Sequence, residues 1–451
     1  MSTRRFKAYL AHKDSGVEWL GKIPAHWATK RLKFVTQRRH RDGTLSALPP
    51  DTEVSFVPME AIGENGGLDL SRTRSISDVS AGYTFFRDGD ILVAKITPCF
   101  ENGKGALANG LVNGIGFGTT ELYVLRPTAD LENRFLYYIS MTDAFRRLGV
   151  AEMSGAGGQK RIPDSFISDF RQCVPTIAEQ REISYFLDKK TAEIDTLVAK
   201  NERLIELLHE RRMSLITRAV TKGLDAHVSM RDSGVEWLGQ IPAHWEVQRL
   251  KNGTSKIGSG KTPSGGAEVY VPNGVIFLRS QNVHFDGLLL DDVAFIDEQV
   301  DAEMAPSRVN DGDVLLNITG ASLGRCCVAQ LNGMRANVNQ HVCVIRPKAT
   351  RYVPTFLANA LSSPAVQAQI FASEDGISRD ALNFEQIAEL EICHPPLAEQ
   401  RRIASFLERK TAEIDSLVGK IRQAIGYLRE LRSGLIADVV TGKVDVRERT
   451  A

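Results

Sequence analysis

Two stretches of this chain have nearly the same sequence, and this repeat decides the fold. Residues 178 to 200 read AEQREISYFLDKKTAEIDTLVAK and residues 398 to 420 read AEQRRIASFLERKTAEIDSLVGK, with 16 of 23 positions identical. A second near-identity precedes each of them: residues 14 to 27 read DSGVEWLGKIPAHW, and residues 232 to 245 read DSGVEWLGQIPAHW. The repeat distance of about 220 residues is far too long for a solenoid, so the repeating unit is a whole domain.

The first repeated stretch predicts a long helix. Residues 178–222 contain neither Gly nor Pro, and apolar residues recur there in the steps of a heptad repeat. Thr176 and Glu179 predict a capping box before the helix, and Gly223 predicts its end. At 1.5 Å per residue such a helix reaches roughly 65 Å. The expected seam residues are Ile183, Leu187, Ile194, Leu197, Leu204, Leu208 and Leu215.

The second repeated stretch predicts an equivalent but weaker helix over residues 398–442, because it carries Gly419, Gly426 and Gly434. Asn201 occupies the first seam where Ile421 occupies the second, and we hypothesise that this polar residue fixes the register of pairing. The expected seam residues of the second helix are Ile403, Leu407, Ile414, Leu417, Ile421, Leu428, Leu431 and Leu435.

Two long helices in one chain have two ways to bury their seams. They can pair antiparallel and act as a spacer between the domains, or each can pack on its own domain. The heptad pattern favours the antiparallel pair.

The residues between the repeated stretches differ but share landmarks. Asp88-Gly89-Asp90 has a counterpart in Asp311-Gly312-Asp313, and Arg126-Pro127 has one in Arg346-Pro347. Strand-like apolar runs are expected at 85–96, 122–125, 313–319 and 342–345, and helices near 133–147 and 353–371. We therefore predict an α+β fold of two β-rich mixed domains, two long helices and a pseudo-twofold internal repeat. The predicted segments are a constant leader (1–27), a first domain (28–177), a central long helix (178–227), a second leader (228–245), a second domain (246–397) and a distal helix with tail (398–451).

Composition excludes several classes of protein. The chain has 451 residues with 56 Lys and Arg against 55 Asp and Glu, which is typical of a globular protein and not of an acidic disordered one. No apolar run approaches ~18 residues, and no signal peptide is indicated, so we expect a cytoplasmic protein without a membrane partner. The six cysteines lack zinc-ligand spacing and are expected to be buried reduced thiols, with Cys326 and Cys327 on opposite faces of a strand.

Motifs for catalysis are missing. No tetrapeptide of the amino-methyltransferase type, no nuclease signature and no metal-binding histidine spacing occurs. Gly258-Ser259-Gly260-Lys261-Thr262 resembles the end of a phosphate-binding loop, but Ser255 stands where the motif needs Gly, and Pro263 would break the following helix. We therefore expect no catalytic residues, no metal and no cofactor in this chain.

Arg, Lys, Asn and Gln are the side chains that hold phosphates or read base edges, and they gather at several places. An ordinary solvated surface is the alternative interpretation, and residues 246–397 carry 12 Lys and Arg against 17 Asp and Glu. The candidate DNA-binding residues are Arg38, Arg39, Arg41, Lys95, Lys104, Gln159, Lys160, Arg161, Lys256, Lys261, Arg279, Gln281, Asn282, Arg325, Asn337, Asn339, Gln340 and Arg379.

The whole layout resembles the specificity subunit of type I restriction–modification systems. The resemblance rests on the repeated leaders with Lys30-Arg31-Leu32-Lys33 and Arg249-Leu250-Lys251, on the helix openings at 175–181 and 395–401, and on the repeated KTAEID at 190–195 and 410–415. Gly260-Lys261-Thr262-Pro263 is also familiar in such domains.

The resemblance implies two target-recognition domains that each read half of a split site in double-stranded DNA. It implies long helices that set the gap between the half-sites, and docking of two modification subunits, which are adenine methyltransferases, and of restriction subunits. The chain itself would then be noncatalytic, and S-adenosylmethionine, ATP and Mg would belong to the partner subunits. The rival hypotheses are an autonomous nuclease or methyltransferase and a coiled-coil scaffold that binds only proteins.

Overall fold

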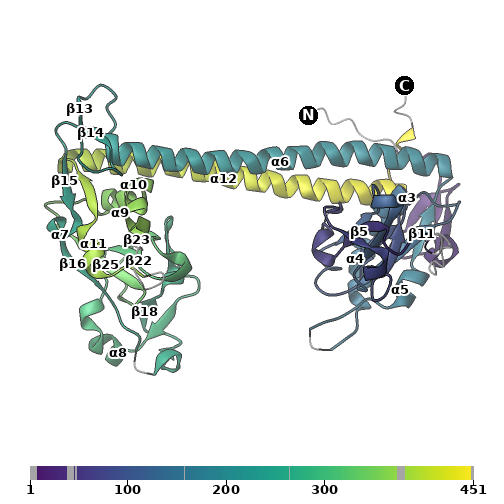
Figure 1. Ribbon diagram of the computed structural model, residues 1–451, viewed down its shortest axis with the longest axis horizontal. Coiled ribbons are helices and arrows are strands. Elements are labelled where there is room, and N and C mark those ends of the chain that lie inside the picture. Colours follow the sequence, from purple (N-terminus) through teal and green to yellow (C-terminus); the bar gives the residue numbers. More distant parts are fainter. Residues whose placement is uncertain are drawn as a thin grey trace. The chain divides into compact units, whose positions relative to one another are not determined.

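The structure is a computed structural model that describes residues 8–37, 45, 48–64, 66–156, 158–263, 265–372 and 381–447. The chain divides into two compact units, one of residues 1–201 with 422–451 and one of residues 202–421. Each unit contains one domain and a part of both long helices, and Figure 1 shows strands and short helices beside the paired helix segments of each unit. The expected α+β fold with an internal repeat and two long helices is confirmed.

The first unit is built on two four-stranded sheets, ordered β6-β5-β10-β7 and β4-β11-β8-β9, in which β5 and β10 are parallel. Strand β12 pairs with β3, and β1 pairs with β2. The strands are β1 (His12–Asp14), β2 (Lys22–Pro24), β3 (Ala28–Arg31), β4 (Thr36–Gln37), β5 (Glu53–Val57), β6 (Thr73–Ser75), β7 (Thr84–Arg87), β8 (Ile91–Ala94), β9 (Gly105–Leu107), β10 (Ile115–Gly118), β11 (Leu122–Pro127) and β12 (Arg171–Val174). The short helices are α2 (Ile76–Val79), α3 (Asn133–Ser140), α4 (Asp143–Ala151) and α5 (Asp164–Asp169).

The second unit repeats this plan with sheets ordered β17-β21-β18-β24 and β16-β25-β22-β23, and the parallel pair is β18 with β24. Strand β15 pairs with β26, β13 with β14, and an added hairpin pairs β19 with β20. The strands are β13 (Met230–Asp232), β14 (Gln240–Pro242), β15 (Glu246–Arg249), β16 (Thr254–Ser259), β17 (Tyr270–Val271), β18 (Val275–Leu278), β19 (Val283–His284), β20 (Gly287–Leu288), β21 (Ala294–Ile296), β22 (Val314–Asn317), β23 (Cys326–Val328), β24 (Ala336–Val338), β25 (Val342–Pro347) and β26 (Glu391–His394). The short helices are α7 (Leu250–Gly253), α8 (Glu298–Glu303), α9 (Pro354–Ser362), α10 (Pro364–Ala372) and α11 (Phe384–Glu389).

Two details differ from the sequence-based expectation. The single helices expected near 133–147 and 353–371 are each two short helices, because Thr142 caps α4 and Ser363 ends α9 just before Pro364. The glycine turn at Gly258 lies on strand β16 and leads into no helix of the phosphate-binding kind.

The central strand of each domain is buried on both faces. In β8, Ile91 and Val93 pack in one apolar cluster and Leu92 packs in another, as the two-residue period of a strand requires. In the equivalent strand β22, Val314 packs in one apolar cluster and Leu315 in another. In the edge strand β23, Cys326 and Cys327 also belong to different clusters, which confirms that they lie on opposite faces. Burial raises the pKa of the Cys327 thiol to about 12, so this thiol is inert.

The shared landmarks of the two domains form the same ion pair on a buried aspartate, with the arginine buried in the first domain and partly exposed in the second. Arg126 donates from Nε and Nη2 to the two carboxylate oxygens of Asp90, both at 2.7 Å. Arg346 donates to Asp313 in the same bidentate way, both at 2.8 Å. In each case the Asp ends the turn before the central strand and the Arg lies on the neighbouring strand, so the pair fixes the start of the strand register.

The turn before each Asp explains the rest of the motif. Gly89 and Gly312 have φ of 90° and 86°, a conformation that favours glycine. Asp88 and Asp311 precede these glycines. Asp88 accepts a hydrogen bond from the backbone N–H of Leu111 after β9, and Asp311 accepts one from that of Leu331 after β23. Asp-Gly-Asp is therefore a structural motif in both domains.

Removal of one partner of this buried pair is expected to be costly. Asp90→Ala leaves the Arg126 guanidinium buried without its carboxylate and should lower the free energy of unfolding by roughly 3–5 kcal/mol. The double variant Asp90→Ala with Arg126→Met should recover part of this loss, because it removes the uncompensated charge. Chemical denaturation measures both, and Glu60→Ala in the exposed Glu60–Arg72 pair serves as a control without effect. Equal stability of Asp90→Ala and the parent chain would contradict the assignment.

The two long helices are α6 (Ile177–Lys222) and α12 (Leu397–Val440). Both are unbroken, so the three glycines of α12 do not interrupt it, in contrast to the expected weakness. The end of α12 shares an apolar cluster with the start of α6 in the first unit, and the end of α6 does so with the start of α12 in the second. The helix segments of each unit are therefore antiparallel, as predicted.

The observed seam corrects the predicted one by a single position. Leu204, Leu417 and Leu431 were expected on the seam, but they are 42%, 44% and 57% exposed. The buried or half-buried positions follow alternating steps of four and three residues and match between the helices at an offset of about 220 residues. They are Ile194, Val198, Asn201, Ile205, Leu208, Arg212 and Leu215 in α6, and Ile414, Val418, Ile421, Ile425, Leu428, Arg432 and Leu435 in α12.

Ion pairs across the helices occur at matching places. Arg432 donates from Nε to Asp195 at 2.9 Å, and Arg212 Nε lies 3.6 Å from Asp415. The amide of Asn201 instead donates to the carbonyl of Leu197 in its own helix, so the hydrogen bond it makes does not cross to α12. The arginines are thus the polar residues that distinguish one register from another, while a register role for Asn201 stays a hypothesis.

The start of α6 shows half of the predicted capping box. Thr176 accepts the backbone N–H of Glu179, but the Glu179 carboxylate does not return to the helix end. It accepts from the hydroxyl of Tyr9 at 2.9 Å and lies 3.0 Å from His26 Nε2. The second copy repeats this contact, with His244 Nε2 2.9 Å from Glu399.

The next residue of the motif ties each helix to its domain. Gln180 is buried, accepts from the backbone N–H of Glu132 at 2.7 Å, and donates to the carbonyls of Asp130 and Pro175. Gln400 makes the equivalent three hydrogen bonds in the second unit. In each unit two of the three hydrogen bonds hold the segment before a short helix against the start of a long one, and the third goes to the carbonyl of Pro175 or Pro395 just before the long helix.

The leaders pack on the ends of the long helices. The first leader contributes Leu20, Ile23 and Trp27 to a cluster that includes Ile436 and Val439 of α12. The second leader makes the same kind of cluster with the end of α6, through Leu238, Ile241, Trp245, Ile216 and Val220. The near-identity of the leaders is thus explained by a shared packing task.

Replacement of the helix glycines by alanine should stabilise the protein. A Cβ atom at Gly419 or Gly426 would meet no atom within 4 Å, so alanine fits the folded helix without strain. Each substitution lowers the backbone entropy of the unfolded chain, which favours the folded state. We expect about 1 kcal/mol each, or a melting temperature about 2–4 °C higher. Gly442→Ala is the matched control and should destabilise, because Gly442 has φ of +75° and its Cβ would lie 2.3 Å from Pro24 Cδ. A lower melting temperature for Gly419→Ala would refute the argument.

Candidate nucleic-acid interface

A loop between α4 and α5 carries three of the predicted DNA-binding residues in the first domain. Its stem is fixed by paired hydrogen bonds between the backbones of Ser154 and Arg161, and by the N–H of Thr97, which donates to the carbonyl of Lys160. Figure 1 shows this blue loop extending from the body of the domain, away from the long helices. The side chains of Gln159 and Lys160 are exposed next to the stem.

Arg161 is held by a carboxylate at the base of this loop. Its Nε and Nη2 donate to the two oxygens of Glu121, both at 2.9 Å, and 44% of its side chain is exposed. The hydrogen bonds from Arg161 lower the pKa of Glu121, and the same pairing raises the pKa of the Arg161 guanidinium. The pair is therefore charged throughout the neutral range.

Two further predicted lysines belong to this domain, and they differ in whether the ammonium group is hydrogen-bonded within the protein. Lys95 ends the central strand, is half-buried, and holds its Nζ 5.6 Å from the centre of the Tyr123 ring. Lys104 donates from Nζ to the carbonyl of Met59 at 3.0 Å, so its ammonium group is already used within the domain. Lys95 thus belongs to the surface around Arg161, and Lys104 is held by the domain itself.

The second domain has the same backbone frame at the equivalent place. In the first domain the N–H of Lys95 donates to the carbonyl of Glu121, and the carbonyl of Lys95 accepts from Ile162. In the second, Ile318 makes both of these bonds, with the carbonyl of His341 and the N–H of Leu382. Lys95 therefore corresponds to Ile318, and Glu121 to His341.

Neutral polar side chains occupy this frame in the second domain. Thr319 Oγ1 lies 2.7 Å from His341 Nδ1, Gln340 Nε2 lies 2.9 Å from His341 Nε2, and the hydroxyl of Thr262 donates to Gln340 Oε1 at 2.6 Å. Both ring nitrogens of His341 are therefore engaged, one with Thr319 and one with Gln340, and the tautomer sets which of them donates. An exposed chain of neutral hydrogen bonds thus stands where the first domain has an Arg–Glu pair. We name these two places the first and the second frame cluster.

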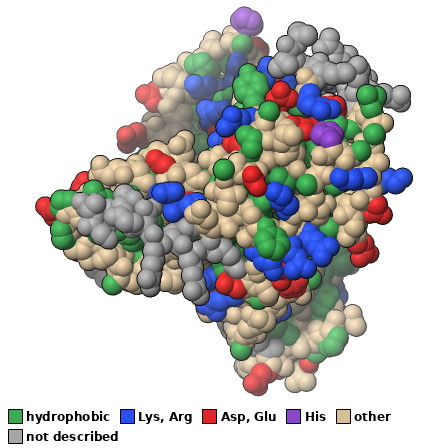
Figure 2. Space-filling model, turned by 90° about the vertical axis from the view of Figure 1, so that its right-hand side faces the viewer, with side chains coloured by type: hydrophobic (Ala, Val, Ile, Leu, Met, Phe, Trp, Pro, Cys, Tyr) green, Lys and Arg blue, Asp and Glu red, His purple; other side chains and the backbone are tan. Residues whose placement is uncertain are grey.

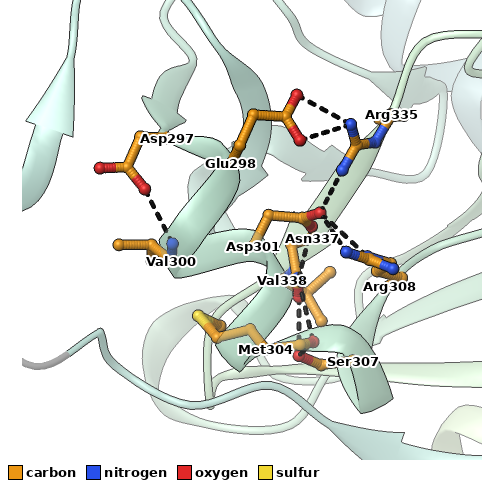
Figure 3. A network of polar contacts seen from close by, with 10 residues as sticks. All are labelled: Asp297, Glu298, Val300, Asp301, Met304, Ser307, Arg308, Arg335, Asn337 and Val338. Carbon is orange, nitrogen blue, oxygen red and sulfur yellow. Dashed lines mark hydrogen bonds and ion pairs between the residues drawn. The ribbon is translucent and has the colours of Figure 1, made fainter.

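Two predicted residues of the second domain are structural. Asn337 is fully buried and bonded to Asp301, to Ser307 and to the carbonyl of Met304, in a network that also binds the guanidinium groups of Arg308 and Arg335 (Figure 3). Asn282 is 2% exposed and donates to the carbonyls of Leu289 and Asp292. Both amides are therefore satisfied inside the domain, and their contact with DNA stays a prediction that no observation supports.

Asn339 is 9% exposed, and its side-chain oxygen accepts the backbone N–H of His341. It therefore shapes the second frame cluster from beneath. Gln340, the next residue, is exposed and is the member of the cluster that was predicted.

Other predicted residues of the second domain are partly committed to protein contacts. Lys256 donates to the carbonyl of Pro306 at 2.5 Å, and burial together with the nearby Arg346 lowers its pKa. Gln281 donates to the carboxylate of Asp292 at 3.0 Å, and Arg279 lies against the same residue. Lys261 is exposed directly before Thr262 of the second frame cluster, and Arg325 is half-buried in the turn before β23.

Four predicted residues, Arg38, Arg39, Arg41 and Arg379, lie outside the described residues. On the face shown in Figure 2, Lys and Arg side chains occur in several groups with acidic side chains beside them. The described surface on that side therefore shows local basic groups rather than one continuous basic face.

Sequence reasoning missed four members of the frame clusters: Glu121, Thr262, Thr319 and His341. Composition does not indicate Glu121, because an acidic residue repels phosphate. The available signal was the position of Glu121 and His341 one residue before the strands β11 and β25, which the shared landmarks align.

Among the described residues, no helix combines the length and the apolar character that crossing a bilayer requires. In the same part of the chain, no three His, Cys, Asp or Glu side chains come together in a way that could hold a metal ion.

Comparison with known proteins identifies the family. Residues 24–206 and 245–426 each match the family described as type I restriction modification DNA specificity domain, so the chain belongs to this family and contains two such domains. The EcoAI specificity subunit of Escherichia coli is 44% identical over 209 residues, which cover 46% of this chain and 32% of that protein. The chain spans about a third or less of the first curated relatives that it matches.

Two broader likenesses cover nearly the whole chain. The putative MjaX specificity subunit of Methanocaldococcus jannaschii is 23% identical over 434 residues, which cover 95% of this chain and 96% of that protein. A solved chain from work on complex assembly and conformational transition of the type I R-M system has a TM-score of 0.74 at 18% identity, and covers 94% of this chain and 99% of that one. The second likeness concerns the fold.

The charge pair of the first frame cluster makes a measurable prediction. In Arg161→Ala, the pKa of Glu121 should rise toward its ordinary value, because the hydrogen bonds that favour the carboxylate are lost. Since pairing lowers the pKa in the folded protein, its stabilisation is present above the ordinary pKa and is lost as the pH falls through the lowered one. Titration of the carboxyl carbon by NMR measures the shift, and an unchanged pKa in the variant would show that the pair does not form in solution.

Proposed function

We propose that this chain is the DNA specificity subunit of a type I restriction–modification complex. Its two domains read the two halves of a bipartite site in double-stranded DNA, and the chain performs no catalysis itself. Two modification subunits and the restriction subunits dock on it and bring S-adenosylmethionine, ATP and Mg. The complex acts in the cytoplasm.

One observation carries the proposal: the two domains share a buried frame and differ in the polar groups placed on it. The Asp–Arg pair, the buried glutamine and the backbone bonds of the frame clusters are the same in both domains. The exposed groups are an Arg–Glu pair in one and a Thr–Gln–His–Thr chain in the other. Reading of two different short sequences requires such a division, because bases are distinguished by donor and acceptor patterns.

The long helices support a docking role. Tyr185, Tyr427 and Leu431 are 71%, 60% and 57% exposed, although large apolar side chains on a helix are ordinarily turned inward. Exposed aromatic and aliphatic residues of this kind are typical of surfaces that bind other proteins. We assign these faces to the modification subunits, and we propose that the lengths of the helices set the spacer between half-sites.

Exchange of one domain tests the proposal. Residues 28–177 are replaced by the equivalent domain of another specificity subunit, and the methylated sequence is determined by methylome sequencing of cells that contain the complex. We expect one half of the recognised site to change and the other half to stay. The reciprocal exchange of residues 246–397 is the matched control and should change only the other half.

Three outcomes would contradict the proposal. Loss of both half-sites after one exchange would show that the domains do not read independently. Methylation or cleavage of DNA by the purified chain alone would indicate an enzyme. An assembled complex without any DNA sequence preference would indicate a scaffold.

A further inference from the structure

The first frame cluster leaves one edge of a guanidinium group available. The bidentate pair with Glu121 uses Nε and Nη2 of Arg161. A guanidinium carries five N–H donors, so both donors of Nη1 and the second donor of Nη2 have no hydrogen-bond partner among the described residues. These donors form a planar fork on the side of Arg161 that faces away from Glu121.

The second frame cluster leaves half of an amide available in the same manner. Gln340 Oε1 accepts one hydrogen bond from Thr262, and Nε2 donates one to His341. The side-chain amide of Gln340 has two donors and two acceptor sites, so one N–H and one lone pair remain without a partner in the part of the chain that the structure describes. The two bonds that are made hold the amide of Gln340 in one plane.

Each of these two edges fits one base. A guanidinium fork matches the O6 and N7 acceptors of guanine in the major groove, and an amide with one free donor and one free acceptor matches N7 and N6 of adenine. Because the side chains are already held by neighbours, little rotamer entropy is lost when the base binds.

We propose that Arg161, held by Glu121, reads a guanine in the half-site of the first domain, and that Gln340, held by Thr262 and His341, reads an adenine in the half-site of the second. This inference rests on the proposed function and adds the residues and bases to it. Lys95, Lys160 and Lys261 surround the two edges and contact phosphates, which position the domain without selecting a base.

The position of the two edges supports this assignment. Arg161 is bonded to Glu121 and Gln340 lies beside His341, and Glu121 and His341 correspond on the shared backbone frame. Arg161 and Gln340 come from different positions of the frame, and both are exposed. Arg161 also lies at the foot of the protruding loop of the first domain, so a groove that receives the loop brings its bases to the guanidinium. The buried candidates Asn282 and Asn337 lack this access.

The test is selection of bound duplexes from a randomised library by the complex of this chain with its modification subunits. The parent complex should select a bipartite sequence. With Arg161→Ala, one G·C pair in one half should become degenerate, with discrimination lowered about 5- to 150-fold, while the other half is unchanged. With Gln340→Ala, one A·T pair in the opposite half should become degenerate to a similar extent.

Three further variants sharpen the result. Arg161→Lys keeps the charge but loses the planar fork, so it should bind with near-parental affinity and a weaker preference for guanine. Glu121→Gln should keep the preference for guanine at lower affinity, because the guanidinium is less firmly held. Arg72→Ala removes an exposed arginine of the same domain that pairs with Glu60, and should leave the selected sequence unchanged.

The outcomes separate the two proposals. If the parent complex selects a bipartite sequence and Arg161→Ala and Gln340→Ala select the same sequence with the same discrimination, the residue assignment is overturned and the proposed function stands. Degeneracy of a base other than the predicted one also overturns the assignment of that residue. If the parent complex selects no sequence at all, the proposed function itself fails.

Discussion

A buried amide side chain joins each domain to a long helix, and the rest of each unit depends on it. Gln180 and Gln400 each place two hydrogen bonds between the start of the long helix and the segment before α3 or α9. A third bond from each goes to a proline carbonyl just before the long helix. Buried polar groups that are fully satisfied specify one arrangement, since any displaced arrangement would leave them unpaired. These contacts set the orientation of each domain, and with it of its frame cluster, relative to the start of the long helix. They do so whatever polar groups the cluster carries.

Much of the fold followed from the repeat, because two copies of one stretch mark what both must preserve. The ends of α6, the antiparallel pairing and the opposite faces of Cys326 and Cys327 were predicted correctly. The seam was misplaced where apolar neighbours compete, as at Leu204 and Ile205. A heptad pattern alone does not decide which of two adjacent apolar residues, such as a leucine and an isoleucine, is buried in the seam. Packing against the facing helix decides it.

The candidate site was less predictable, because composition does not show which polar groups are already paired. Asn282 and Asn337 have the chemistry of base readers, yet buried carbonyl and carboxylate groups use their amides. Glu121 has the wrong charge for a DNA contact, yet it orients Arg161 across 40 residues of sequence. Only the backbone frame brings these residues together, and the frame comes from strand pairing that single-sequence patterns do not reveal.

The packing of the leaders means that the order of the two halves along the chain is not fixed by the fold. The second leader follows the end of α6 directly and packs on it, whereas the first leader packs in the same way on the end of α12, from which it is separated by the whole sequence. Tyr9 and Arg447 are in contact, with the guanidinium carbon 4.8 Å from the ring centre. A circularly permuted chain, opened between α6 and the second leader and closed between these two residues, would keep every cluster described above.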